Sequence, residues 1–195
     1  MGWVSIGGEM NRFTVNSAMN SACVLGALLL CGLSLANAQG VPPVPAADQL
    51  AMLKSNDPQL ARNKQLVFDF WRICYEGGHM DKVPDYLTPE YIQHNPNVKS
   101  GRDTWIKLFS EVRKPKPVAP LIKVPVISII AERDIVMVSF VRRVRDRVHP
   151  ESIYEMTWYD VFRIDARSGK IAEHWDSSER WGADGRPPGA EFMPQ

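Results

Sequence analysis

The sequence lacks several features that would assign it quickly to a functional class. It has three cysteines among 195 residues, and its 23 basic and 22 acidic residues give a formal net charge of +1. A protein that attracts nucleic acid electrostatically normally has a basic excess or a basic stripe. The one basic cluster here is the short run from Arg142 to Arg147. The composition therefore predicts no nucleic-acid partner.

The spacings that hold metal ions and phosphates are also missing. Neither HExxH nor CxxC occurs, and no two of the four histidines lie four residues apart. The sequence contains no glycine-rich phosphate loop and no serine nucleophile elbow. We therefore expect no metal ion and no cofactor.

No apolar run is long enough for a comfortable membrane span, and the longest extends from Ala22 to Leu35. Arg12 precedes this run, and the small-x-small site Ala36-Asn37-Ala38 follows it. This order predicts a signal peptide over residues 1–38, with Met10 as the true start. We expect an exported protein, periplasmic or secreted, without stable membrane association after cleavage. An uncleaved N-terminal anchor is the alternative.

Signal cleavage would leave Cys74 as the single cysteine, so no internal disulfide is expected. After the signal we expect a linker and short helix over 39–56, a domain over 57–180 and a tail over 181–195. Helical spacing and capping residues predict three helices in the domain, over 57–76, 79–87 and about 100–112. In the third, Trp105, Leu108, Phe109 and Val112 are expected to be buried. Thr88-Pro89-Glu90 is expected to break the chain before a short extended segment, 91–96.

The apolar pattern then changes to strict alternation. It predicts four strands joined by short turns, over 121–131, 135–145, 152–165 and 171–178. Helices followed by such a meander predict an α+β fold, with N-terminal helices packed on a curved antiparallel sheet of four main strands. A strongly twisted sheet with helices on one face leaves a conical hollow for side chains or a ligand.

The last hairpin concentrates titratable groups. Alternation places one set of side chains on a common face of the third strand: Tyr154, Trp158, Asp160 and Phe162. On the fourth strand, His174 and Asp176 share one face, and Glu173 and Trp175 share the other. A slip of one residue exchanges these two faces, so Asp160 meets either His174 and Asp176 or Glu173. Both registers remain open at this level.

A carboxyl group among aromatic rings has its pKa raised by lost hydration, and a neighbouring imidazole can share its proton. The catalytic candidates are Asp176, Asp160 and His174. His94 and Asn95 are expected near the mouth of the hollow, where they would orient a carbonyl or enolate oxygen. The alternative is that Asp160 and His174 bond to each other or to the backbone and only hold the hairpin. Asn95 would then form a turn, and His94 would be a junction histidine with its hydrogen bonds satisfied.

Three segments carry a resemblance to a known family: YIQHNPNVKSGRDTWIKLF, WYDVFRID and GKIAEHWD. They resemble the SnoaL-like group of the nuclear transport factor 2-like superfamily, in particular a bacterial subgroup of predicted aldol-condensation enzymes. The resemblance spans about Asn63 to Asp176 and implies a cone of three helices on a curved antiparallel sheet. It also implies cofactor-free aldol closure with Asp176 or Asp160 as acid/base, and His174 and His94 in the pocket. The ending SSERWGADGRPPG departs from the leucine-rich ending usual in the cyclases.

We therefore expect a cofactor-free acid/base enzyme that acts beside a carbonyl of a small apolar substrate. The reaction would be of the aldol/cyclase, isomerase or dehydratase type. The residues expected to bind substrate are His94, Asn95, Tyr154, Trp158 and Phe162. The alternative is a non-catalytic module that binds a small ligand. The resemblance also implies a homodimer formed through the exposed sheet face.

Overall fold

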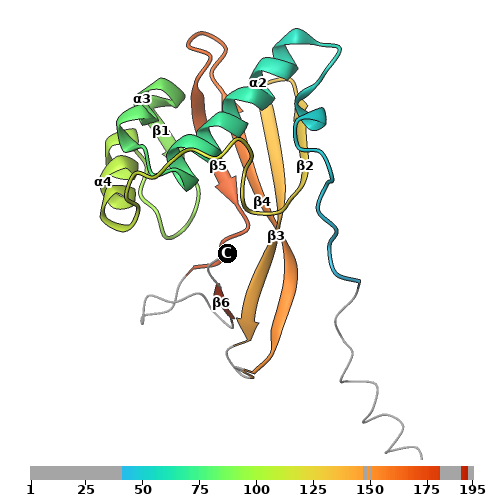
Figure 1. The fold of residues 1–195 in the computed structure, drawn as a ribbon. Coiled ribbons are helices and arrows are strands. Elements are labelled where there is room, and N and C mark those ends of the chain that lie inside the picture. Colours follow the sequence, from blue (N-terminus) through green and yellow to red (C-terminus); the bar gives the residue numbers. More distant parts are fainter. Residues whose placement is uncertain (1–40, 147–148, 150, 181–189, 193–195) are drawn as a thin grey trace, which may run out of the picture. The chain divides into compact units, whose positions relative to one another are not determined.

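The described part of the chain folds as one α+β unit, as the sequence predicts (Figure 1). The computed structural model describes residues 41–146, 149 and 151–180, and the backbone of strand 190–192. The predicted signal peptide and the rest of the predicted tail lie outside the described residues. No helix among the described residues is long and apolar enough to cross a membrane.

Helix α2, Pro58–Asp69, begins where the sequence predicts. The Asp57 carboxylate accepts hydrogen bonds from Gln59 N at 2.7 Å and Leu60 N at 3.4 Å, and proline occupies the first turn. The helix then widens into a π-helical segment, Phe70–Glu76. The sequence therefore predicts the extent of this helix but not its change of type. Widened turns of this kind are frequent at functional sites.

Two short helical elements follow, a 3₁₀ turn, Met80–Lys82, and α3, Val83–Tyr86, before the longer α4, Arg102–Val112. The prediction that α4 buries Leu108 and Val112 is wrong, because they are 38% and 72% exposed. Among the predicted residues of this helix, Trp105 is buried at 3% exposure.

Among the described residues the sheet has six strands, five of them in the order β1-β5-β4-β3-β2 and the sixth, β6, paired with β3. Their bounds are β1 Leu87–Gln93, β2 Val126–Glu132, β3 Ile135–Asp146, β4 Ile153–Ile164, β5 Ile171–Asp176 and β6 Ala190–Phe192. The four predicted strands are confirmed as the antiparallel meander β2 to β5, although β2 begins at Val126 instead of Leu121.

Strand β1 corrects two predictions. The predicted break at Thr88-Pro89-Glu90 lies inside this strand, and β1 runs parallel to β5, so the sheet is mixed. Proline is tolerated here because β1 is an edge strand, where a missing N–H need not remove a ladder hydrogen bond.

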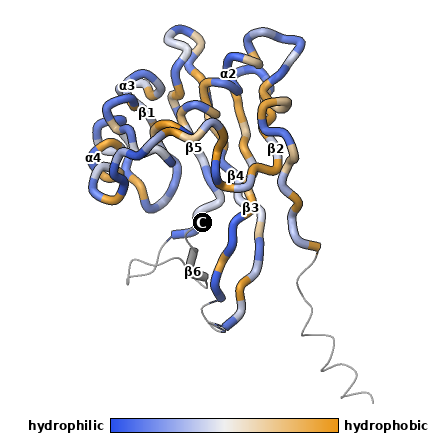
Figure 2. The backbone as a smooth tube through the Cα atoms, in the orientation of Figure 1, coloured by the Kyte–Doolittle hydropathy of each residue, from blue (hydrophilic) through white to orange (hydrophobic). Residues whose placement is uncertain are grey.

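The core lies between the helical layer and one face of the sheet. Figure 2 shows apolar residues along the upper parts of the central strands, which α2 crosses in Figure 1. The largest fully buried side chains are Tyr91, Phe68, Phe140, Phe162, Leu87 and Ile171. Trp71 packs its ring on Phe140 with centroids 4.4 Å apart, which joins the π-helical segment to β3.

The register of the last hairpin is the feature that positions the site. Asp160 lies opposite Asp176, and Phe162 lies opposite His174. The turn between the strands is fixed by Asp165, whose carboxylate accepts from Ser168 N at 2.9 Å, and by Gly169 at a φ of 67°. Of the two registers that the sequence leaves open, the structure has the one that groups Asp160 with His174 and Asp176.

Candidate functional site

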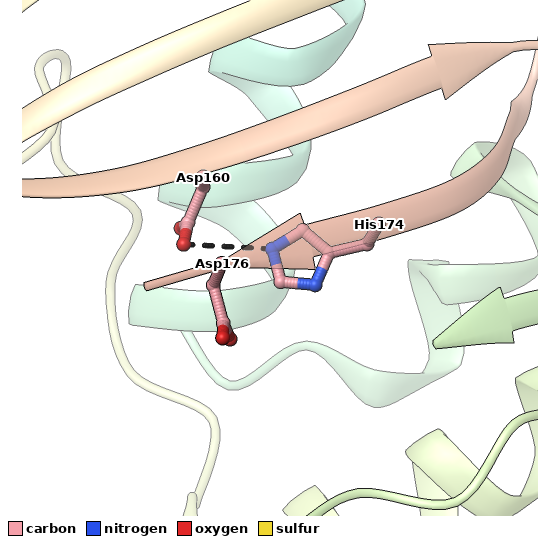
Figure 3. Close-up of side chains that lie close together, drawn as sticks. All are labelled: Asp160, His174 and Asp176. Carbon is pink, nitrogen blue, oxygen red and sulfur yellow. Dashed lines mark ion pairs between the residues drawn. The ribbon is translucent and has the colours of Figure 1, made fainter. Parts of the chain in front are cut away.

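Asp160, His174 and Asp176 form a compact cluster on β4 and β5. One ligating atom from each lies within 4.8 Å of the others, and Figure 3 shows the three side chains converging from the neighbouring strands. Asp160 is 5% exposed and His174 is 8% exposed, whereas Asp176 is half-buried. The predicted grouping of the three catalytic candidates is therefore present in the structure.

The Asp160 carboxyl faces His174 and also accepts a hydrogen bond. Trp158 Nε1 donates to Asp160 Oδ1 at 3.0 Å, and His174 Nε2 lies 3.5 Å from the same oxygen. An indole N–H can only donate, so the carboxyl oxygen is the acceptor in the first contact. Whether the neutral His174 ring donates a hydrogen bond to Asp160 depends on which ring nitrogen carries the hydrogen.

Gln93 decides that question through a chain of hydrogen bonds. The backbone N–H of Asn95, which can only donate, gives a hydrogen bond to Gln93 Oε1 at 3.1 Å. The same oxygen lies 2.8 Å from His174 Nδ1, so this nitrogen must be the donor. In the neutral ring Nε2 therefore carries no hydrogen and faces Asp160 Oδ1, so the pair can take up one further proton between these two atoms.

Asp176 has different partners. Its Oδ2 accepts from Asn95 Nδ2 at 2.6 Å, and its Oδ1 accepts from the backbone N–H of Ser178 at 2.9 Å. Both carboxyl oxygens thus receive hydrogen bonds from donors, the pattern that suits an ionised carboxylate. The two carboxyl groups on facing strands therefore have different partners, an indole and an imidazole for Asp160 and two amide N–H groups for Asp176.

The cluster opens into a cavity of about 370 Å³ with mostly apolar walls. Its apolar and aromatic lining is Phe70, Trp71, Tyr75, Tyr91, Val98, Trp105, Leu108, Phe109, Val112, Trp158 and Phe162. Its polar lining is Gln93, Asn95, Asn97, Arg142, Asp160, His174, Asp176 and Ser178. The size and the mix of lining suit a small, largely apolar ligand with a few polar groups.

Tyr91 and Gln93 are pocket residues that the sequence reasoning missed. Tyr91 is 1% exposed, and Gln93 Nε2 donates to its hydroxyl oxygen at 3.3 Å. Burial, and then the nearby charges of Asp160 and Asp176, raise the pKa of Tyr91 well above its usual value. The signal that could have found both residues is alternation, because they share a strand face with Asn95.

A SnoaL-like domain model matches residues 67–174, more than half of the chain. The chain belongs to the SnoaL-like family. This membership confirms the resemblance seen in the sequence. No curated protein matches the chain.

Solved structures similar to this SnoaL-like protein include three bacterial ones. A proposed SnoaL-like polyketide cyclase from Jannaschia sp. CCS1 has 13% identity and a TM-score of 0.45, covering 64% of this chain and 91% of that chain. A proposed polyketide cyclase from Acidithiobacillus ferrooxidans has 14% identity and a TM-score of 0.42, with coverages of 63% and 89%. TsrD from Streptomyces laurentii has 19% identity and a TM-score of 0.40, with coverages of 63% and 90%.

The structure of this SnoaL-like protein does not bring His94 into the pocket. Its Nε2 lies 3.0 Å from Glu173 Oε2, and its ring stacks on Trp175 with centroids 4.5 Å apart. Arg163 Nη1 also donates to Glu173, at 2.6 Å. His94 follows Gln93 directly, so alternation turns it to the opposite face. The expectation that His94 lines the pocket is therefore wrong.

The other predicted substrate-binding residues divide in the same way. Asn95, Trp158 and Phe162 line the cavity, whereas Tyr154 does not. Tyr154 lies opposite Val144, farther along the β3–β4 hairpin from Asp160. The prediction of a shared strand face is sound, but the cavity ends before Tyr154.

The cluster of Asp160, His174 and Asp176 is also the one group among the described residues with the geometry to hold a metal ion. His174 Nε2 and one oxygen from each aspartate would be its ligands. Each carboxylate already accepts a hydrogen bond, from Trp158 Nε1 or from Asn95 Nδ2, and these donors would compete with a cation for the same lone pairs. A larger and more open hollow of about 580 Å³ lies at the start of α2 and contains none of the predicted site residues.

Proposed function

We propose that this SnoaL-like protein is a cofactor-free acid/base enzyme acting beside a carbonyl of a small, largely apolar substrate. The observation that carries the proposal is the cluster of Asp160, His174 and Asp176 at the wall of an apolar cavity. Two carboxyl groups with different partners can divide the roles of base and acid within one site.

Asp176 is the better candidate for the base. It is half-buried and lines the cavity, and its hydrogen bonds from Asn95 and Ser178 favour the carboxylate form. It would remove a proton from the carbon beside the substrate carbonyl and so form an enolate. Asp160 and His174 would then supply their shared proton to the product oxygen or carbon, and Asp176 would return its proton to them.

This division of roles fits an aldol closure, an isomerisation or a dehydration, because each needs one proton removed and one delivered. No step requires a metal ion or an organic cofactor. We therefore expect turnover to be unchanged by a chelator such as EDTA. A cavity of about 370 Å³ limits the substrate to a small ring system or a short chain.

One observation favours the second candidate function, a ligand-binding module without turnover. Asp160 and Asp176 both accept hydrogen bonds from protein groups, so the cluster would also suit a purely structural role. Incubation with a panel of small cyclic ketones in D₂O separates the two functions. An enzyme of the proposed type exchanges the protons beside the carbonyl, followed by proton NMR, whereas a binding module retains the ketone without exchange.

Export and dimerisation are proposed on separate grounds. The apolar run from Ala22 to Leu35 and the small residues after it support export to the periplasm or medium, which predicts a mature N-terminus at Gln39 by intact-mass measurement. Ile130 and Tyr159 are 53% and 44% exposed on strands of the sheet and support a homodimer through that face. The mass in solution tests the dimer independently of activity.

A further inference from the structure

Tyr91 is buried in the cavity wall without a role in the proton transfers described above. Tyr91 lies on the same strand as Gln93. Its hydroxyl is close enough to Asp160 and Asp176 for their charges to add to the effect of burial in raising its pKa. A neutral phenol buried beside an acid/base cluster is a hydrogen-bond donor throughout the working pH range.

The direction of the hydrogen bond at this phenol follows from the backbone. Asn95 N–H fixes the oxygen of the Gln93 amide, so the amide nitrogen is the end that reaches Tyr91. Because this nitrogen donates, the phenol oxygen accepts, and its own hydrogen is left to donate elsewhere. Among the described residues this hydroxyl forms no second hydrogen bond, and the side chain lines the cavity.

We propose that the Tyr91 hydroxyl donates a hydrogen bond to the oxygen that becomes negative when the substrate enolises, and that Gln93 is the positioning residue that aims it. This inference rests on the proposed function and names its oxyanion-binding group. As the α-proton moves to Asp176, the C–H electron pair becomes the enolate π bond and negative charge collects on the former carbonyl oxygen. A fixed donor in an apolar pocket stabilises that charge more than it stabilises the neutral ketone.

The same arrangement predicts a preference that binding alone can detect. A phenolate has the shape and charge of a small cyclic enolate, and it would accept the Tyr91 hydrogen bond at its oxygen. A ring of similar size without an oxygen, such as toluene, would not. The proposal therefore predicts that the pocket binds phenolates more tightly than toluene, and that Tyr91 is the reason.

The test compares the wild-type chain with Tyr91→Phe and with Tyr86→Phe as a matched control. Tyr86 packs its ring 6.1 Å from that of Phe70 and does not line the cavity. In Tyr91→Phe we expect kcat for ketone exchange to fall by about 100-fold with little change in KM, as for loss of one oxyanion donor. The affinity of Tyr91→Phe for nitrophenolate should fall at least about tenfold, while its affinity for toluene stays unchanged. In Tyr86→Phe the kcat for exchange and both ligand affinities should match those of the wild type.

Unchanged exchange and unchanged phenolate affinity in Tyr91→Phe would overturn the assignment, and so would a wild-type pocket with no preference for phenolate over toluene. The exchange measurement and the binding measurement test the proposed function and the role of Tyr91 separately. Absence of ketone exchange by the wild type contradicts the proposed function, whereas phenolate binding still decides the role of Tyr91. Normal exchange by Tyr91→Phe contradicts only the role of Tyr91.

Discussion

Gln93 Oε1 lies 2.8 Å from His174 Nδ1 and accepts its hydrogen, because the same oxygen is already oriented by the backbone N–H of Asn95. The backbone N–H of Asn95, two residues after Gln93, thus selects one tautomer of the imidazole through the Gln93 side chain. That tautomer turns an Nε2 without hydrogen toward Asp160, so the pair can accept one proton between Nε2 and Oδ1.

The relay predicts a specific ring state for His174. At a pH where the ring is neutral, nitrogen NMR should show Nδ1 protonated and Nε2 bare. In Gln93→Leu the acceptor is gone, and we expect the two tautomers to mix. Gln65→Leu is the control, since Gln65 is exposed on α2 and bonds to Asp69. An unchanged Nδ1-protonated ring in Gln93→Leu would show that another group sets the tautomer.

Asp160→Asn separates the acid step from the base step. Asparagine keeps the shape and still accepts from Trp158 Nε1, but it cannot share a proton with His174. We expect product formation from a confirmed substrate to fall at least about 100-fold, while hydrogen exchange beside the carbonyl falls much less. Parallel measurement of product formation and exchange checks this expectation, and equal losses in both would assign base and acid to the same residue.

Glu173→Gln tests the charged cluster on the opposite face of the sheet. Hydrogen bonds from His94, and then from Arg163, lower the pKa of Glu173 below its usual value. A carboxyl group with a lowered folded-state pKa stabilises the fold above its unfolded pKa of about 4.3, and this stabilisation is lost as the pH falls through the lower folded value. We therefore expect Glu173→Gln to lower stability near neutral pH and to match the wild type in strong acid.

Urea unfolding midpoints between pH 7 and pH 2.5 provide the measurement. Glu111→Gln, on the exposed surface of α4, is the matched control and should follow the wild type at every pH. Wild-type and Glu173→Gln curves that stay parallel down to the lowest pH would contradict the stabilising role of this carboxylate.

The sequence predicts most of the meander because alternation and turn residues act locally. Asp165, Ser168 and Gly169 form the last turn, and their backbone geometry sets the register that the alternation alone leaves open. Strand β1 escapes prediction because it pairs with β5 across a long separation, and a proline inside it resembles a local break. Nonlocal pairing of this kind has no signature in a short window of sequence.

The site was partly predictable for the same reason. Asp160, His174 and Asp176 follow from alternation on neighbouring strands once the register is known. The pocket position expected for His94 is wrong because it rests on side-chain chemistry and ignores the strand face. Alternation along residues 91–95 would have turned His94 away and placed Tyr91 and Gln93 in the pocket. Cys74 is a buried free thiol, and burial raises its pKa to about 12.

The central claim is that Asp176 is the base that removes the proton beside the carbonyl. Its most direct test compares the rate of ketone hydrogen exchange in Asp176→Asn with the rate in Asp103→Asn. Asp103 lies on the exposed first turn of α4, outside the cavity, so its substitution should leave exchange unchanged. The account predicts that Asp176→Asn loses at least about 100-fold in exchange rate while still binding the ketone. Exchange by Asp176→Asn at the wild-type rate would contradict it.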